Sequence, residues 1–493
     1  MSVTASPGDG PEFPDVGHLF LVPEDAATAR AATPVWLLGE ADHAAEVAGL
    51  SEAQARWLTG QRFTGAARRQ AIVPAPDGTV AGVALGSGNG LAGDPCGPSE
   101  LLLGSLAQSL PPGDYRLAAP PRTTRADTDE LAAVAWGLGA YRFQRYRSGS
   151  PEPRPRLVVP EGTDAKRIAA IVEAVWFGRD LINTPACDMS PDDIESAARM
   201  LAGRHGARIA VITDDELLAR NFPMIHAVGR ASNVPPRLID LRWQPRQGGS
   251  EATTLTLVGK GISFDTGGLD IKPSSGMLLM KKDMGGAASA LALGHMIMAL
   301  ELPVRLRILI PAAENAISGN AFRPGDVLVS RAGTTVEIGN TDAEGRLVLG
   351  DALTYAGEEN PDIVISLATL TGAARVALGP DLPALFCDDD ALAARILAAG
   401  AAVGDPLWRM PFWPGYEKGL DSEVADMGNV SDGPFAGAIT AALFLRRFAK
   451  GAGRYAHIDL FAWRPSQRPL GPKGGEPHAA RALLAALMEE VAR

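Results

Sequence analysis

Cysteine is scarce in this sequence. Its 493 residues include three cysteines, Cys96, Cys187 and Cys387, which lie far apart and form no CxxC or Cys/His pattern. That spacing argues against a zinc site built from thiolates. So few cysteines are typical of a reducing compartment, and we expect a cytoplasmic protein. The first residues also lack a basic stretch followed by an apolar run, so we expect no secretory signal peptide.

Basic charge and long apolar runs are scarce as well. Acidic residues outnumber basic ones by 57 to 46, and the net charge of −11 argues against a nucleic-acid partner. The longest apolar stretch, residues 285–302, contains His295 and Glu301. We therefore expect a buried helix there rather than a membrane span, and no membrane partner. With 46% apolar and 21% charged residues, the composition is that of a globular protein.

The order of apolar patterns predicts an α/β protein with two unequal domains. The first part contains short strands near residues 19–22 and 35–38 and a helix near 129–147. A helix capped at Thr163–Asp164 and running to about Leu181 is expected to connect it to a larger part. There, strands alternate with helices, which is typical of a mixed, mostly parallel sheet between helices. We expect a smaller N-terminal α/β domain, a connecting helix and a larger C-terminal domain over residues 1–160, 161–184 and 185–493.

Polar residues follow the strands of the larger part. Lys260, Glu314 and Thr369 each come soon after a strand-like run. Ligands of such sheets bind at the carboxyl ends of the strands, so we expect these residues at one edge. The strand-like runs are 254–258, 304–310, 363–368 and 455–460.

The segment Asn340–Leu347 (NTDAEGRL) is the most informative part of the chain. Asp342, Glu344 and Arg346 lie two residues apart, and in an extended segment such residues point to the same side. Carboxylates this close repel one another unless a positive charge lies between them, and a metal ion meets that need better than one arginine. The alternative interpretation is a solvated acidic loop in which the arginine pairs locally.

A second group of charged residues surrounds a glycine-rich turn, Gly259–Gly268. It contains Lys260 and Asp265, and Lys272 and Asp283 follow. The glycines allow a tight turn and a close approach to a ligand, but the GxxxxGK[ST] and GxGxxG phosphate-binding patterns are absent. The alternative interpretation makes Asp283 the N-cap of a helix and Asp265 a turn residue.

Four carboxylates exceed what one divalent ion needs. Asp265, Asp283, Asp342 and Glu344 suit two ions about 3.5–4 Å apart, as in hydrolytic two-metal sites. None of the seven histidines lies in these segments, and His295 and His457 are expected to be structural. A nitrogen ligand could come from Lys260 if its amine were neutral, which burial beside cations favours.

These motifs resemble the leucyl aminopeptidase family, the M17 cytosol aminopeptidases. Asn340–Leu347 matches the family's signature octapeptide without a departure. Two further active-site blocks match in spacing, Gly259–Lys272 (GKGISFDTGGLDIK) and Met277–Ala288 (MLLMKKDMGGAA). The resemblance spans about residue 140 to the C-terminus. Shorter matches occur at Tyr141–Phe143, Arg179–Pro185 and Ala436–Ala442.

The resemblance implies a role for each matched residue. One tightly held ion would have Lys260, Asp265, Asp283 and Glu344 as ligands. An exchangeable ion would have Asp265, Asp342 and Glu344, with the Asp342 backbone carbonyl, so that Asp265 and Glu344 bridge the two. Lys272 and Arg346 match the two catalytic positions that bind no metal: Lys272 would stabilise the oxyanion, and Arg346 would hold a bicarbonate that acts as general base. The resemblance also implies Mn²⁺ or Zn²⁺ as cofactors, short peptides as substrates and a homohexamer.

The substrate pocket is expected at positions where the family lines it. Met280, Thr369 and Gly372, with neighbouring Asn340 and Leu370, would form an apolar, roomy slot suited to Leu or Met. Plain core packing is the alternative for Met280. The chain departs from the family near its end: a Gly-Ala-Thr-Gly segment is not found, the strand near 455–460 continues into Phe461–Trp463, and residues 471–478 read GPKGGEPH. That departure bears on one wall of the pocket.

We therefore predict a metalloaminopeptidase that removes N-terminal, preferably Leu-like residues. Two alternatives use the same fold or residues. One is a non-catalytic scaffold or DNA-binding role, which the filled catalytic positions and the net acidity argue against. The other is phosphoester hydrolysis on two metals, which does not explain Lys260 or the complete octapeptide.

Overall fold

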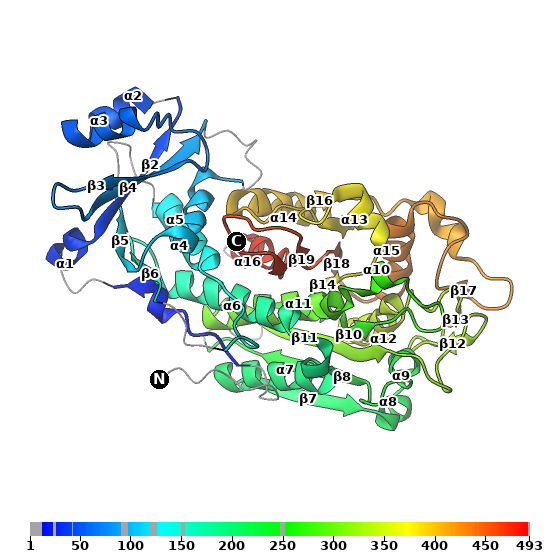
Figure 1. Ribbon diagram of the computed structural model, residues 1–493. Coiled ribbons are helices and arrows are strands. Elements are labelled where there is room, and N and C mark those ends of the chain that lie inside the picture. Colours follow the sequence, from blue (N-terminus) through cyan, green and yellow to red (C-terminus); the bar gives the residue numbers. More distant parts are fainter. Residues whose placement is uncertain are drawn as a thin grey trace.

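Two bodies of unequal size lie side by side in the computed structural model (Figure 1). It describes residues 12–22, 26–41, 43–89, 97–118, 126–148, 153–246 and 252–491. Cys96 lies outside these ranges, and Cys187 and Cys387 are free thiols. No described helix has the length and apolar character needed to cross a membrane.

The smaller, N-terminal body is built on a mostly parallel sheet. Its described strands are ordered β1-β6-β5-β2-β4-β3, with β3 alone antiparallel to its neighbour. The strands are β1 (Phe20–Leu21), β2 (Thr33–Gly39), β3 (Gln70–Pro74), β4 (Val80–Gly88), β5 (Gly113–Leu117) and β6 (Pro155–Val158). The helices are α1 (Ala26–Ala31), α2 (His43–Ala48), α3 (Glu52–Gly60), α4 (Leu106–Ser109) and α5 (Ala126–Gly139).

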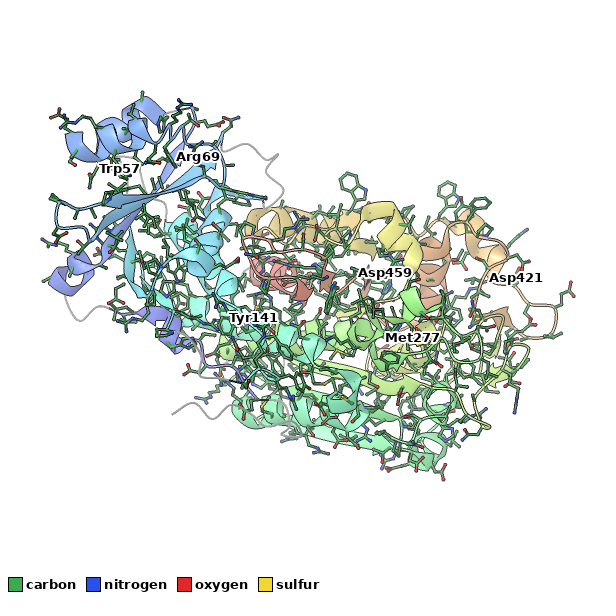
Figure 2. The ribbon with its side chains drawn as sticks, viewed as in Figure 1. Trp57, Arg69, Tyr141, Met277, Asp421 and Asp459 are labelled. Carbon is green, nitrogen blue, oxygen red and sulfur yellow. The ribbon has the colours of Figure 1, made fainter. Side chains whose placement is uncertain are left out.

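Two expected elements of this body differ in length from the prediction. The strand near 19–22 is reduced to Phe20–Leu21. The helix expected over 129–147 ends at Gly139, because the chain that follows lies against the next helix instead of continuing into solvent. There the hydroxyl of Tyr141 donates to Asp180 Oδ1 at 2.7 Å, and Tyr141 lies between the two bodies (Figure 2).

The connecting helix α6 (Ala165–Asn183) begins where the sequence predicted it. The side chain of Asp164 caps its first turn by accepting from the backbone N–H groups of Lys166 and Arg167. Its first half packs into the core of the smaller body through Ile168 and Val172, and its second half, with Phe177, packs into the core of the larger body. One helix is therefore shared by both cores. The exact boundaries at 160 and 184 stay predictions.

The larger body contains a mixed sheet. Its described strands follow the order β16-β15-β18-β14-β9-β11-β8-β7, and β10 pairs with β11. The central strands β18, β14, β9 and β11 run parallel, whereas β7, β8 and β15 are antiparallel to a neighbour. The strands are β7 (Arg208–Thr213), β8 (Arg237–Trp243), β9 (Thr253–Gly259), β10 (Gly261–Asp265), β11 (Val304–Asn315), β14 (Ile363–Ala368), β15 (Ala384–Cys387), β16 (Trp408–Arg409) and β18 (Arg454–Asp459).

Helices cover both faces of this sheet (Figure 1). Side chains alternate along the strands, so that Leu257 packs into the core on one face and Val258 into the core on the other. The helix expected at 285–302 is the buried α11, and His295 within it is 1% exposed, as predicted for a core histidine. One face carries α6, α7 (Pro191–His205), α11 (Gly285–Ala299), α14 (Asp390–Val403) and α16 (Ala480–Val491). The other carries α9 (Pro223–Gly229), α12 (Gly345–Gly357) and α15 (Gly437–Phe448).

Short elements complete the larger body. The helices are α8 (Asp215–Ala219), α10 (Ser274–Met277) and α13 (Gly372–Leu378). The strands β12 (Val327–Val329), β13 (Thr335–Glu337) and β17 (Met427–Gly428) form a small sheet, and β19 (Trp463–Arg464) pairs with β20 (Gly474–Gly475). The carboxyl ends of β9, β14 and β18 lie next to one another at one edge of the main sheet, where a site is expected.

Candidate metal centre

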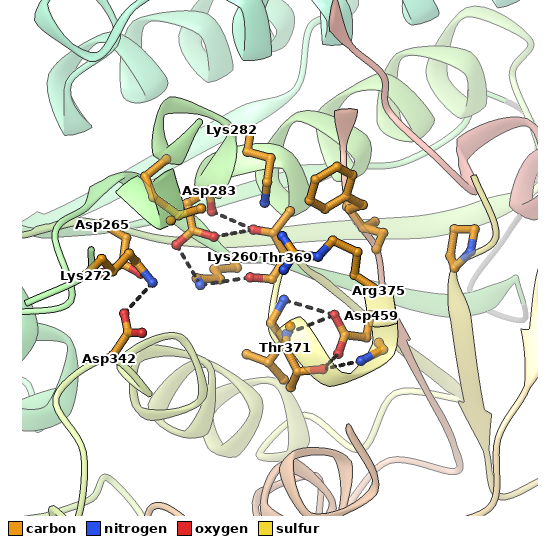
Figure 3. A pocket seen from close by; sticks show the side chains of 18 of the residues that line it. Lys260, Asp265, Lys272, Lys282, Asp283, Asp342, Thr369, Thr371, Arg375 and Asp459 are labelled. Carbon is orange, nitrogen blue, oxygen red and sulfur yellow. Dashed lines mark hydrogen bonds and ion pairs between the residues drawn. The ribbon is translucent and has the colours of Figure 1, made fainter. Parts of the chain in front are cut away.

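The charged residues singled out by the sequence meet at this edge of the sheet. Lys260 directly follows β9, and Asp265 is the last residue of β10. Asp283 lies in the short helical turn that precedes α11, and Glu344 directly precedes α12. Because these strands and helices converge at the same sheet edge, residues more than eighty positions apart become neighbours (Figure 3).

Carboxylates and lysines interleave in this cluster. Oxygen atoms of Asp265, Asp342 and Glu344 all lie within 4.8 Å of one another. The Lys260 Nζ lies 2.7 Å from Asp283 Oδ2 and 2.9 Å from Glu344 Oε1. Lys272 bridges the remaining two acids, at 2.8 Å from Asp265 Oδ2 and in contact with Asp342 Oδ1.

The cluster is short of positive charge. Burial first, and then the nearby carboxylate of Asp265, raise the pKa of Glu344 to about 8 and that of Asp342 to about 6. Burial alone would lower the pKa of Lys260, but Asp283, Glu344 and Asp265 outweigh it and raise that pKa above its usual range. Two ammonium groups thus leave four acids incompletely neutralised. A divalent cation would supply the missing charge.

Several oxygen atoms also retain free lone pairs. Asp283 Oδ2, Asp342 Oδ1 and Glu344 Oε1 are buried, and none accepts a hydrogen bond from a described residue. They lie at ion-pair distances from the ammonium nitrogens of Lys260 and Lys272. Orphaned, buried carboxylate oxygens are the ligands that Mg²⁺, Mn²⁺ and Zn²⁺ accept, so the residues present fit a metal site.

The structure decides between the local alternatives for these acids. Glu344 is 1% exposed, which rules out a solvated acidic loop. Asp283 does not cap α11, because Met284 occupies the N-cap position and makes no side-chain cap. Asp283 Oδ1 accepts instead from the Thr369 hydroxyl at 2.7 Å. Asp265 is both a turn residue and a member of the charged site. Its Oδ1 accepts from the Gly267 N–H at 2.8 Å, while its Oδ2 faces Lys272.

The expected extended geometry of the octapeptide is wrong. Glu344 has helical backbone angles, and Arg346 already belongs to the first turn of α12. Asp342 and Glu344 still converge, because the turn that enters the helix brings them together. Arg346 points elsewhere and donates from Nη1 to the Asn429 backbone carbonyl at 2.6 Å.

Arg346 nevertheless keeps an unused donor. Its side chain is buried, and its Nε makes no hydrogen bond to a described residue. Burial lowers the pKa of Arg346 to about 10, although Glu344 and Asp459 oppose that shift. A buried guanidinium with an unfilled N–H at the start of a helix fits a small anion.

Comparison with known proteins agrees with this geometry. The family profile "Cytosol aminopeptidase family, catalytic domain" matches residues 176–484, and "M17 aminopeptidase, N-terminal domain" matches residues 33–160. This chain belongs to the M17 cytosol aminopeptidase family. It is therefore a metallo-exopeptidase of the hydrolase class, whose activity is the metal-dependent removal of N-terminal residues.

Individual relatives cover most of the chain. The probable cytosol aminopeptidase of Syntrophotalea carbinolica is 41% identical over 368 residues, 72% of this chain and 73% of that protein. A crystal structure of cytosol aminopeptidase from Coxiella burnetii is 43% identical, with a TM-score of 0.87 over 96% of this chain and 99% of that one. The bottromycin maturation enzyme BotP in complex with Mn is 32% identical, with a TM-score of 0.82 over 94% and 100%.

A cavity of about 290 Å³ opens beside the aminopeptidase metal centre (Figure 3). Four of the expected pocket residues, Met280, Thr369, Leu370 and Gly372, line it, so Met280 is more than core packing. Asn340 lies outside the lining, and its side chain instead accepts from the Asp342 N–H at 2.7 Å. Four of the expected metal ligands, Lys260, Asp265, Asp283 and Asp342, also line the cavity, as does the expected catalytic Lys272, whereas Glu344 and Arg346 do not.

The C-terminal departure from the family affects the pocket through one residue only. Phe461 lines the cavity, whereas no residue of 471–478 does. The latter segment packs on α6 instead, so closely that a Cβ at Gly475 would lie 2.6 Å from the Cβ of Ile182. Of the two departures from the family, only the one at residues 461–463 therefore bears on a wall of the pocket.

Two residues that support the site were missed or misplaced by the sequence reasoning. Asn315 at the end of β11 donates to Asp265 Oδ1 at 2.9 Å, while the expected Glu314 points to the opposite side and accepts from the Ser232 hydroxyl. The error is one residue, which in a strand reverses the side chain. Asn429 holds the octapeptide from a distant loop by donating from Nδ2 to the Asn340 carbonyl at 2.7 Å, and no sequence pattern marked it.

Other lining residues were not expected either. They are Pro273, Gly276, Lys282, Thr371, Ala374, Arg375, Gly379, Leu382, Pro383, Asp459 and Leu460. Asp459 is the last residue of β18, so the rule that sites gather at the carboxyl ends of strands could have found it. Lys282 lies inside a recognised block, next to Asp283, but nothing in its type marked it.

Proposed function

We propose that this aminopeptidase hydrolyses the N-terminal peptide bond of short peptides with two divalent ions. The observation that carries the proposal is the buried set Asp265, Asp283, Asp342 and Glu344, with Lys260, at the mouth of a cavity that reaches about 290 Å³. The acids are too many and too close to stand without cations.

The proposed ligands divide between the two ions. One ion would be held by Asp265, Asp283, Glu344 and the neutral amine of Lys260, whose ammonium must lose a proton when the ion binds. The other would be held by Asp265, Asp342 and Glu344, together with the Asp342 carbonyl. The carboxylate oxygens of Asp265, Asp342 and Glu344 lie within 4.8 Å of one another, which supports their assignment to one ion. Mn²⁺ or Zn²⁺ is proposed; BotP was solved with Mn. When bound, the ions would supply Lewis acidity that activates a water for attack on the carbonyl.

Lys272 would stabilise the oxyanion that develops on the scissile carbonyl. Its ammonium lines the cavity and is held in place by Asp265 and Asp342. Burial opposes the charge, but these two acids outweigh it and raise the pKa of Lys272 above its usual range. The group therefore stays charged at neutral pH and is already oriented before reaction, which is what electrostatic stabilisation requires.

Arg346 would hold a bicarbonate that acts as general base. Its free Nε and its position in the first turn of α12 support binding of a planar anion. The Asn429 carbonyl fixes the other side of the guanidinium. Arg346 thus positions the base. None of the described residues that line the cavity is a histidine, and His457 is buried and hydrogen-bonded to Ser366.

The pocket walls favour the acceptance of an apolar N-terminal side chain. Met280, Gly372, Leu382 and Leu460 contribute apolar or small surfaces to the cavity, which supports the Leu-like substrates predicted from the sequence. A homohexamer and a cytoplasmic location are proposed from the resemblance to leucyl aminopeptidases. Light scattering of the purified chain would test the hexamer.

Release of a chromophore from leucyl p-nitroanilide tests the proposal. Metal-stripped protein should be inactive, and added Mn²⁺ or Zn²⁺ should restore turnover. The same samples should show no hydrolysis of bis(p-nitrophenyl) phosphate and no retention on DNA at physiological salt. Metal-replete protein that cleaves the phosphodiester but no aminoacyl amide would overturn the peptidase proposal.

A further inference from the structure

Two cations lie together at the end of the cavity away from Lys272. The Lys282 Nζ is 4.7 Å from the centre of the Phe461 ring, and the Arg375 guanidinium is 5.4 Å from the same centre. Both residues and the ring line the cavity (Figure 3). The ring attracts each cation, but it carries no net charge and neutralises neither.

Neither cation forms an ion pair with a described residue. Within the described ranges, no hydrogen bond or ion pair joins Lys282 Nζ or the Arg375 guanidinium to another residue. The charges of two acids of the lining act on Lys282, and both acids have other partners: Asp283 Oδ2 lies 2.7 Å from Lys260 Nζ, and Asp459 is already occupied. It accepts from the Leu370 N–H at 3.0 Å, the Thr371 N–H at 3.2 Å and the Thr371 hydroxyl at 2.6 Å.

The neighbouring lysine shows what a paired cation looks like here. Lys281 donates to the Asn183 carbonyl at 2.5 Å and lies outside the lining. Lys282 is 5% exposed, so it has given up most of its water without gaining a partner in exchange. Burying an ammonium in this way costs free energy unless a ligand supplies the opposite charge.

The rest of this region suits a short apolar stem. Met280, Gly372 and Phe461 surround the space with apolar or small groups, and the two cations lie beyond them. We propose that the same pocket, whose apolar walls accept Leu, prefers an N-terminal residue whose apolar stem ends in a carboxylate, Glu or Asp. Lys282 would bind that carboxylate directly, and Arg375 would add long-range attraction from its exposed position. The inference rests on the proposed aminopeptidase function and names its substrate class.

Aminoacyl p-nitroanilides of Glu, Gln and Leu test the inference on Mn²⁺-loaded enzyme. Gln matches Glu in shape without the charge, so the Glu/Gln ratio of kcat/KM isolates the effect of the carboxylate. A charge-assisted hydrogen bond predicts a ratio of about 10- to 100-fold in favour of Glu. Lys282→Met, or Lys282→Gln if the first variant folds poorly, should bring the ratio to near one. Arg375→Met should lower it by about threefold, because the group is exposed.

The matched control is Lys281→Met. It removes the same charge one residue earlier, from a lysine that donates to the Asn183 carbonyl and lies outside the cavity. Its Glu/Gln ratio should equal that of the wild type. Thermal unfolding provides a second readout: Lys282→Met should raise Tm, because an unpaired buried charge is removed, whereas Lys281→Met should not.

The outcomes separate the inference from the function beneath it. Turnover of Leu with a wild-type Glu/Gln ratio near one, or an equal change in both lysine variants, overturns the acidic preference and leaves the aminopeptidase intact. If Lys282→Met slows Leu-Gly but not leucyl amide, the cation binds the peptide's C-terminal carboxylate and the inference is wrong. No turnover of any amide by metal-loaded enzyme overturns both.

Discussion

Two buried charge clusters in this protein differ in whether the protein itself supplies enough positive charge for the buried acids. At the metal centre, acids outnumber cations and burial raises the pKa of Glu344 to about 8. At the domain junction, Glu476 lies between Arg179, at 2.8 Å, and Arg464, at 3.1 Å. Burial alone would raise the pKa of Glu476, but the two arginines outweigh it and lower that pKa to about 2.

The difference shows which cluster is complete. In the junction cluster (Arg179, Arg464 and Glu476) the protein supplies the counter-charges. Arg179 also donates to the carbonyls of Leu138 and Leu470, so it joins the smaller body to the larger one. In the metal centre the protein supplies more acids than lysines, and three of the oxygen atoms that contact the lysines accept no hydrogen bond from a described residue. A complete cluster is built for stability, and an incomplete one for a ligand.

The largest expected effect is loss of activity on removal of a bridging acid. Glu344→Gln keeps the shape but removes the charge, and loss of several kcal/mol of metal-centred stabilisation should lower kcat/KM by roughly 10³-fold or more. The control is Glu314→Gln, since Glu314 lies near the same sheet edge but faces away. Steady-state kinetics on leucyl p-nitroanilide measures both. Near wild-type turnover in Glu344→Gln would remove this residue from the site.

The junction cluster should respond in stability rather than in chemistry. Arg179→Met leaves Glu476 with one arginine, and it leaves the carbonyls of Leu138 and Leu470 without their donor. The change should lower the free energy of unfolding by about 3–5 kcal/mol. Arg220→Met breaks an exposed pair with Glu216 and should cost about 1 kcal/mol or less. Urea unfolding measures both. Equal losses in the two variants would contradict the distinction between buried and exposed pairs.

Lys272 should affect the rate without abolishing metal binding. Lys272→Met removes the proposed oxyanion donor and should lower kcat by about 10²–10³-fold. Because Lys272 competes with the metals for Asp265 and Asp342, the variant should bind Mn²⁺ at least as tightly as the wild type. Kinetics and calorimetry on one preparation separate the two effects. A variant that loses its metal would identify Lys272 as a structural support instead.

The smallest effect concerns pH. Glu344, with a pKa near 8, and Asp342, with a pKa near 6, hold protons in the metal-free protein that must leave when a metal binds. Metal affinity should therefore rise with pH between about 5 and 8, by about tenfold per pH unit for each proton released. Calorimetric titration with Mn²⁺ at pH 6, 7 and 8 measures this slope. Because Lys260 must also release a proton to become a ligand, an affinity independent of pH would mean both that the acids are already ionised and that Lys260 does not bind the metal.

The sequence predicted the metal-centre residues because their signal is local. Each expected acid and lysine lies within one of three short segments, the octapeptide and the blocks at 259–272 and 277–288, and each segment is recognisable by itself. The α/β fold and the connecting helix were also predictable, since alternating patterns and the Asp164 cap reflect local rules. The roles of the individual residues stay proposals.

What the sequence could not show depends on contacts between distant segments. Asn429 reaches Asn340, and Arg375 reaches Phe461, only after the chain has folded. The octapeptide was expected to be extended because alternation of charges imitates a strand, whereas the tertiary structure turns it into a helix start. Whether a buried lysine has a partner, as Lys281 does and Lys282 does not, is likewise a property of the folded protein.

A titration of metal-stripped protein with Mn²⁺ tests the central claim most directly, with bound metal and leucyl p-nitroanilide turnover measured on the same samples. The account predicts that turnover is absent without metal and reaches its plateau as two ions bind per chain. In Asp283→Asn, the tighter site should be lost first. Full turnover in the presence of excess chelator, or two bound ions with no turnover of any aminoacyl amide, would contradict it.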